Sequence, residues 1–281
     1  MKFIKVLLLY AFACQPALLF AGIKVDKDIN YTNKDDVRRQ LNVYYRKDIT
    51  AKKDVVIFIH GGSWSSGKKD TYWWIGRNLA RKEVITVTIN YGLTPQNKFM
   101  QMGNDCAAAV KWVAAHISDY GGNPQRIFLM GHSAGAHLAE LINADPRYFK
   151  EAGIANPVKG VILNDPFGLD MKEYMSAAEK DGSYYDFLRS FTADPVNWEK
   201  GSPLHYVQNS RNPHLIFYGS KTYPAIQLQS ARLHKLLREQ QVPVTLQVIK
   251  GKKHVGMISQ MVFGGNELYG FILKFLKETH T

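Results

Sequence analysis

Residues 126–143, RIFLMGHSAGAHLAELIN, decide the fold. The apolar run at residues 126–130 predicts a buried strand, and the apolar spacing after it predicts a helix. Between the two lies GHSAG at residues 131–135, a G-x-S-x-G pattern that turns the chain sharply from strand to helix. The two glycines remove side chains that would clash in such a turn. We therefore expect the Ser133 hydroxyl to project from the carboxyl edge of a sheet, with the Ala134 N–H at the helix start behind it.

Apolar runs and helical stretches alternate along the rest of the chain. Short apolar runs bounded by Gly, Pro or Asn are typical of the buried strands of a parallel sheet, and their alternation with helices predicts a doubly wound α/β fold. The strands are expected at residues 37–45, 55–59, 84–90, 126–130, 158–163, 215–218 and 244–249. The helices are expected at residues 102–117, 134–143, 227–239 and 269–277. We therefore predict one mostly parallel α/β domain over residues 23–281.

Residues 170–213 interrupt this alternation because they contain no strand pattern. We predict a small helical insertion before the penultimate strand. Its aromatic residues are Tyr174, Tyr184, Tyr185, Phe187, Phe191 and Trp198. Two interpretations remain open: a connection with a small core of its own, or a cap whose aromatic side chains line a pocket.

Composition excludes several classes of protein. Hydrophobic residues make up 46% of the 281 residues and charged residues 21%, which excludes a disordered chain or a coiled coil. The formal net charge is +12, but the basic residues are spread along the chain and accompany no nucleic-acid-binding motif. We interpret the charge as a solvated basic surface and expect no nucleic-acid partner. No apolar stretch after residue 22 is long enough to predict a stable membrane span.

Residues 1–22 have the pattern of a secretory signal peptide. Lys2 and Lys5 precede short apolar runs, and small residues follow near Ala21. An exported protein, periplasmic or secreted, is the expectation; Cys14 leaves a lipoprotein as the alternative. Cys106 is the other cysteine of the chain, so we expect no internal disulfide and a buried Cys106 in a helix.

Two further segments carry chemistry. His60-Gly61-Gly62-Ser63-Trp64 follows the expected strand at residues 55–59, where Gly62 and Ser63 would add backbone N–H donors to that of Ala134 in an oxyanion hole. His254 follows the last expected strand and comes after Ser133 in the chain, as the general base must in this arrangement. The other histidines near or after Ser133 are expected to be structural: His132, His137, His205, His214 and His234.

Together these motifs resemble the α/β-hydrolase superfamily, and within it the esterase branch of hormone-sensitive-lipase-like, feruloyl-esterase-like and kynurenine-formamidase-like enzymes. The resemblance covers residues 31–277. Asn90-Tyr91-Gly92-Leu93-Thr94-Pro95 is similar to the family's Y-R-L-x-P segment, with Gly92 in place of Arg, and Ser202-Pro203-Leu204 is similar to its Ser-Pro after the insertion. The resemblance implies an acyl-enzyme mechanism on a small ester, with no metal or organic cofactor.

The sequence departs from this family at the catalytic acid. The family usually takes its acid from the loop after the strand at residues 215–218, but that loop carries Thr222 and no carboxylate. Pancreatic-type lipases of the same superfamily place the acid after the preceding strand, which here ends at Asp165. We expect Asp165 to be the acid; Asp170 is the second choice, and a Ser–His dyad oriented by Thr222 or a backbone carbonyl is the third.

Three functions follow from these residues. The first is a serine-dependent hydrolase of carboxylic esters, with Ser133 as nucleophile, His254 as base and Asp165 as acid. The second is a formamide or amide hydrolase of the same fold. The third is a hydrolase-fold binding protein with impaired catalysis, which the neutral Thr222 would favour. The oligomeric state is left open.

Overall fold

The computed structural model describes residues 22–33, 35–47 and 51–279. Of the predicted signal peptide, only Gly22 falls within these ranges; Cys14 lies outside them. Across the described ranges, no helix combines the length and apolarity needed to cross a membrane.

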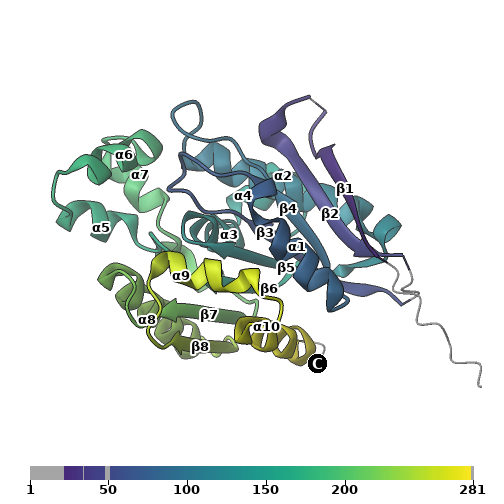
Figure 1. Ribbon diagram of the computed structural model, residues 1–281. Helices are drawn as coiled ribbons and strands as arrows, with labels where there is room; N and C mark the ends of the chain where they lie inside the picture. The colour runs from purple at the N-terminus through teal and green to yellow at the C-terminus, as the bar shows by residue number, and fades with distance from the viewer. Residues whose placement is uncertain (1–21, 34, 48–50, 280–281) are drawn as a thin grey trace, which may run out of the picture.

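The described residues form one eight-stranded sheet in the order β1-β2-β4-β3-β5-β6-β7-β8 (Figure 1). From β4 onward along this order the neighbouring strands are parallel, whereas β2 is antiparallel to both β1 and β4. The strands are β1 (Ile23–Asn30), β2 (Gln40–Arg46), β3 (Lys53–Ile59), β4 (Ile85–Ile89), β5 (Gly122–His132), β6 (Val158–Asn164), β7 (His214–Gly219) and β8 (Val244–Ile249). The predicted mostly parallel sheet is confirmed.

Helices cover both faces of this sheet, which makes it doubly wound. One face carries α2 (Phe99–His116), α3 (Ala134–Ala144) and α8 (Pro224–Glu239). The other carries α1 (Trp73–Arg81), α9 (His254–Ser259) and α10 (Glu267–Glu278). The shorter helical elements are α4 (Arg147–Glu151) and the 3-10 turns η1 (Val37–Arg39), η2 (Lys69–Tyr72), η3 (Ile117–Tyr120) and η5 (Gln260–Val262).

Strand β3 shows why the central strands have continuous apolar sequences. Val55, Ile57 and Ile59 pack into the core on one face of the sheet, and Val56 and Phe58 pack into the core on the other. Because side chains alternate between the two faces and both faces are covered, every position of this stretch is apolar. Cys106 is buried in α2, as predicted, and burial raises the pKa of its thiol.

The N-terminal strands differ from the prediction. Residues 37–39 form η1, so β2 begins only at Gln40, and β1 precedes it as a strand that the apolar pattern did not indicate. β1 lies at the edge of the sheet, alternates half-buried with charged exposed positions, and has a register shift between Asp26 and Ile29. An edge strand with a bulge needs little apolar sequence, which explains why the pattern missed it.

Between β6 and β7 the chain is helical, without a strand. This segment contains α5 (Met171–Ala177), α6 (Gly182–Phe191), α7 (Pro195–Lys200) and the 3-10 helix η4 (Pro203–Asn209). Figure 1 shows α5, α6 and α7 grouped at the end of the molecule away from β1 and β2. Phe191 and Trp198 are buried there, and the ring of Phe191 stacks on Phe99 of α2 at 5.1 Å. The segment therefore has a small core that joins the main one.

Candidate active site

Ser133 occupies the sharp turn between β5 and α3. Its backbone has φ 57° and ψ −125°, a conformation that a residue with a side chain rarely adopts. A Cβ on Gly131 would lie 2.3 Å from the Gly135 carbonyl carbon, and a Cβ on Gly135 would lie 2.1 Å from the Ile59 carbonyl oxygen. Both glycines are therefore required by close backbone contacts, and together they hold Ser133 in its strained position.

His254 begins α9, directly after the loop that follows β8. Its Nε2 lies 2.8 Å from Ser133 Oγ, so the serine hydroxyl can donate a hydrogen bond to a neutral imidazole. The other ring nitrogen, Nδ1, lies 2.5 Å from Asp165 Oδ2. The structure thus brings Ser133, His254 and Asp165 into one hydrogen-bonded chain, in the order that a catalytic triad needs.

Asp165 follows β6 and is completely buried. Its φ of 53° lies in the left-handed region, and its other oxygen, Oδ1, accepts the Gly219 N–H at 2.9 Å. Gly219 ends β7, the neighbouring strand. Because a buried polar group needs hydrogen-bond partners, this backbone N–H helps to hold the Asp165 carboxyl group in the interior.

Thr222 lies in the loop after β7, where the family resemblance leads one to expect the acid. Its hydroxyl donates to Asp165 Oδ2 at 2.5 Å, the same oxygen that His254 Nδ1 contacts. The threonine therefore contacts the carboxylate, and the carboxylate contacts the imidazole. His254 Nδ1 thus contacts the Asp165 carboxyl group, in contrast to the alternative of a Ser–His dyad oriented by Thr222.

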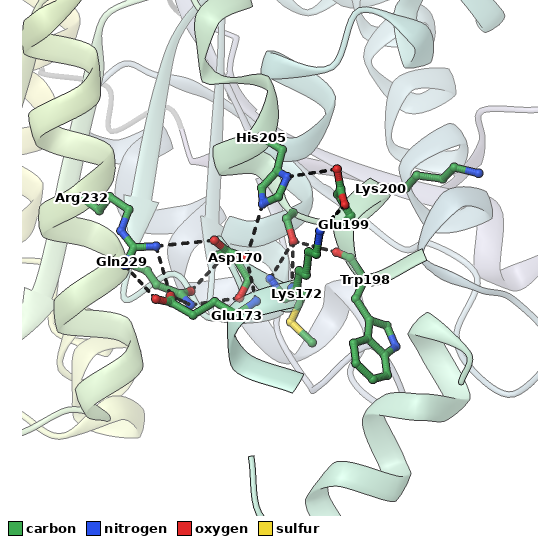
Figure 2. Close-up of polar contacts among 12 residues, drawn as sticks. Asp170, Lys172, Glu173, Trp198, Glu199, Lys200, His205, Gln229 and Arg232 are labelled. Atoms are coloured by element: carbon green, nitrogen blue, oxygen red, sulfur yellow. Dashed lines mark hydrogen bonds and ion pairs between the residues drawn. The ribbon is translucent and has the colours of Figure 1, made fainter. Parts of the chain in front are cut away.

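Asp170, the second choice for the acid, belongs to a separate polar cluster. Its Oδ1 accepts the Glu173 N–H at 2.9 Å and so caps α5, and its Oδ2 lies 3.5 Å from Arg232 Nη1. His205 Nε2 lies 3.6 Å from Asp170 Oδ1. Figure 2 shows these side chains converging on Asp170. The cluster joins α5 to α8 and η4, so the role of Asp170 in this structure is to fix these elements together.

The loop after β3 lies against the serine turn. A Cβ on Gly61 would lie 3.2 Å from the Ser133 Cβ, and the backbone then turns through positive φ at Gly62 (123°), Ser63 (50°) and Trp64 (58°). The Gly62 carbonyl accepts the N–H groups of two residues further along the loop, at 3.0 and 2.9 Å. These bonds fix the turn, so the loop does not need to reorganise to present its N–H groups.

Ser63 and Ala134 line the same cavity as Ser133 and His254. Ala134 is the first residue of α3, so its N–H has no partner within the helix. The two backbone segments predicted to form the oxyanion hole therefore border the space next to the serine hydroxyl. Their action as donors remains a prediction.

The cavity beside Ser133 has a volume of about 490 Å³ and is largely aromatic. Its aromatic residues are Trp64, Phe167, Tyr174, Phe187 and Tyr223. Two of them, Tyr174 and Phe187, come from the helical insertion and line the cavity, as the cap interpretation predicts. Phe191 and Trp198 of the same insertion pack inside it, as the interpretation of a connection with its own core predicts. Phe167 and Tyr223 were not anticipated; Phe167 lies two residues after Asp165, and Tyr223 directly follows Thr222.

The buried histidines near the site are neutral. Burial and the nearby His254 lower the pKa of His132 to about 3, and its ring stacks on that of His254 at 4.9 Å. Burial also lowers the pKa of His60 and of His137 to about 4. His137 Nδ1 accepts the Trp64 indole N–H at 3.2 Å and its Nε2 lies 2.7 Å from the Gly201 carbonyl oxygen, so it joins the cavity wall to the insertion.

Metal ligation requires a cluster of suitable donors. Among the residues that the structure describes, no group of three or more His, Cys, Asp or Glu side chains is arranged to hold a metal ion.

Comparison with known proteins places these features in a wider context. The family model described as BD-FAE matches residues 41–237, which is well over half of the chain. A probable isoprenylcysteine alpha-carbonyl methylesterase of Arabidopsis thaliana, ICMEL1, is 28% identical over a match that covers 89% of this chain and 56% of the plant protein. Esterase LipC of Mycobacterium tuberculosis is also 28% identical, over 66% of this chain and 49% of LipC. The match thus spans about half the length of each relative.

Solved structures share the fold at lower sequence identity. Esterase B from Lactobacillus rhamnosis superposes with a TM-score of 0.78 at 21% identity, covering 92% of this chain and 86% of the esterase. A truncated carbohydrate esterase from gut microbiota gives the same TM-score of 0.78 at 19% identity, covering 92% of this chain and 97% of that one. These likenesses confirm the predicted α/β-hydrolase fold.

Proposed function

Since the chain belongs to the BD-FAE family, we propose that it is a serine-dependent hydrolase that cleaves carboxylic esters through an acyl-enzyme intermediate. The observation that carries the proposal is the hydrogen-bonded chain from Ser133 Oγ through His254 to Asp165. The activities named for the relatives, those of esterases and a methylesterase, support the same reaction type.

The proposed reaction begins with proton transfer from Ser133 to His254 Nε2. As the proton leaves, Ser133 Oγ attacks the ester carbonyl, and Asp165 stabilises the imidazolium through Nδ1–H. His254 then donates the proton to the oxygen of the leaving alcohol, and the acyl group remains on Ser133. A water molecule, deprotonated by His254, then attacks the acyl-enzyme. The bond from the acyl group to Ser133 Oγ breaks, His254 returns the proton to Oγ, and the acid is released.

Backbone N–H groups of Gly62, Ser63 and Ala134 are the proposed donors to the oxyanion of each tetrahedral intermediate. Loss of one such donor typically raises the barrier by roughly 3–4 kcal/mol. Their support is geometric: Ser63 and Ala134 border the cavity beside Ser133, and Gly62 lies in the fixed turn before Ser63.

The proposed substrate is a small or aromatic ester. Five aromatic side chains around the cavity favour a flat or apolar group next to the scissile bond. The carbohydrate esterase among the structural neighbours, at 19% identity, argues only for the fold.

The neutral side chain of Thr222 is not evidence for a binding protein without catalysis in this structure. That interpretation depended on an imidazole without a carboxylate partner, whereas Asp165 Oδ2 lies 2.5 Å from His254 Nδ1. All three side chains of the proposed triad are thus in hydrogen-bonding contact.

A fluorophosphonate probe tests the proposal directly, because it labels only an activated serine. We expect the folded protein to be labelled and Ser133→Ala to be unlabelled. Ser118→Ala is the matched control, since Ser118 is exposed in η3, just beyond the end of α2, and it should label normally. A folded protein that resists the probe and hydrolyses no ester would refute the proposed function.

We also propose that the protein is exported, on the basis of the charged and apolar pattern in residues 1–22. Fractionation of the expressing cell with N-terminal sequencing of the mature protein tests this. A mature chain near residue 23 outside the cytoplasm is expected, a lipid-modified Cys14 would support the alternative, and an intact Met1 would refute export.

A further inference from the structure

An apolar groove of about 290 Å³ lies between α5 and α8, outside the catalytic cavity. Its walls include Ala177 and Ala178 at the end of α5, and Leu228 on α8. Leu228 is 56% exposed, and the groove around it is mostly apolar, with Glu173 and Gln229 as its polar lining residues. A large aliphatic side chain left exposed beside small ones forms a surface on which an apolar group could pack.

This groove adjoins the cavity that contains Ser133. Tyr174 and Ala225 line both spaces. The Tyr174 ring lies 4.9 Å from that of Phe167 inside the cavity, so this tyrosine forms the wall at the junction. A molecule bound at Ser133 would enter the groove by passing Tyr174 and Ala225, and would meet a lining that is mostly apolar.

Polar contacts between α8 and the start of α5 hold the walls of the groove in place. Gln229 on α8 is buried and makes two hydrogen bonds to the Asp170 backbone, one to N and one to O, both 3.0 Å. Arg232 Nη2 lies 2.8 Å from Glu173 Oε1 at the far side of the same interface. Figure 2 shows Gln229 and Arg232 reaching from one helix toward Asp170 and Glu173. The groove is thus formed before any ligand binds.

The position of the groove relative to His254 indicates which part of an ester it would receive. His254 Nε2 must return its proton to the oxygen of the leaving alcohol, so that oxygen has to lie on the His254 side of the cavity. The Tyr223 ring packs 5.3 Å from the His254 ring, and Pro224 and Ala225 continue the wall from there to the groove.

We propose that the groove is a subsite for the alcohol portion of the substrate, and that the enzyme prefers esters of apolar alcohols long enough to reach it. The inference rests on the proposed ester hydrolysis and adds which side of the ester is selected. Each methylene buried in the groove should raise kcat/KM by up to about fourfold.

Two series of esters test this inference, with hydrolysis followed by titration of the released acid. The first lengthens the alcohol, from ethyl to butyl to hexyl acetate; the second lengthens the acyl group, from ethyl acetate to ethyl butyrate to ethyl hexanoate. We expect kcat/KM of the wild type to rise along the alcohol series. Ala177→Trp, which fills the groove from an exposed position, should flatten that rise and leave ethyl acetate hydrolysis within about twofold.

Leu228→Asp should flatten the same series without filling the groove, because it replaces the apolar wall with a charge. Ala193→Trp is the matched control; Ala193 is also exposed in the insertion but lies before α7, and its alcohol series should stay like that of the wild type. A flat wild-type alcohol series, or equal losses on all esters in Ala177→Trp, would overturn the subsite. Absence of any Ser133-dependent hydrolysis would instead overturn the proposed function, and the subsite with it.

Discussion

The most direct test of the proposed triad moves its acid from the loop after β6 to the loop after β7. Asp165→Asn removes the negative charge next to His254 Nδ1 while nearly keeping the shape of the side chain. Because an amide can present its NH2 group to Nδ1, it also favours the wrong tautomer of the imidazole. Loss of the triad acid typically lowers kcat by about 10⁴-fold, or roughly 5.5 kcal/mol.

Thr222 contributes less because it acts through Asp165. Thr222→Val removes one hydrogen bond to a carboxylate, worth about 1.5–3 kcal/mol, and leaves the contact between Asp165 and His254. We therefore expect kcat to fall between about tenfold and one hundredfold. Thr222→Ser keeps the hydroxyl and should recover most of the activity, whereas a purely steric role for the threonine methyl group would leave Ser as impaired as Val.

The double variant Asp165→Asn/Thr222→Asp moves the carboxylate to the loop after β7. Thr222 Oγ1 and His254 Nδ1 each lie 2.5 Å from the same Asp165 oxygen, so a carboxylate at position 222 starts within one side chain of the imidazole. The amide introduced at position 165 could then donate to the carboxylate introduced at position 222, which reverses the present hydrogen bond. We expect kcat at least tenfold above that of Asp165→Asn alone, measured on a short ester at about pH 8. If Asp165→Asn keeps more than a tenth of the wild-type kcat, the assignment of Asp165 as the acid is wrong.

Two further predictions concern stability. The pKa values of His60, His132 and His137 are lowered in the native state, so the unfolded chain binds protons before the native one as the pH falls below about 6.5. The free energy of unfolding should therefore decrease by up to about 4 kcal/mol per pH unit between about pH 6 and pH 4. Urea denaturation at several pH values measures this decrease, and a flat profile would mean that these imidazoles are charged in the native state. Gly135→Ala should destabilise the protein by at least about 3 kcal/mol, because its Cβ would lie 2.1 Å from a backbone oxygen. Gly270→Ala on α10, where a Cβ meets nothing within 4 Å, should stabilise the protein slightly. Equal midpoints of urea denaturation for the two variants would contradict the packing argument.

The sequence indicated the fold and much of the site because both depend on local patterns. Strand, turn and helix around Ser133 follow from consecutive residues, and His254 follows from its place after the last strand. The apolar pattern could not reveal β1, because an edge strand with alternating charged residues has little apolar periodicity. The aromatic residues Phe167 and Tyr223 were missed for another reason: the direction of a side chain in a loop depends on backbone conformation, which spacing does not give.

The choice between Asp165 and Asp170 illustrates the same limit. Both are acidic residues in the segment after β6. The resemblance to pancreatic-type lipases favours Asp165, but residue spacing does not show which of the two side chains reaches His254. The structure separates them through local conformation. Asp165 turns inward with a positive φ toward His254, whereas Asp170 caps a helix and joins a cluster with Glu173 and Arg232.

The arrangement around Asp165 also gives a physical reason for a neutral residue at position 222. Two segments converge on one buried carboxylate, which accepts from Gly219 N–H and Thr222 at the end of β7 and the loop after it, and from His254 at the start of α9. A second carboxylate at position 222 would lie within hydrogen-bond distance of the first, and two like charges that close cannot both stay ionised, so one would take up a proton. A hydroxyl avoids this conflict because it donates to the existing charge. Thr222→Asp in the presence of Asp165 should therefore gain nothing over the wild type, although the same substitution restores activity when the Asp165→Asn change is also present.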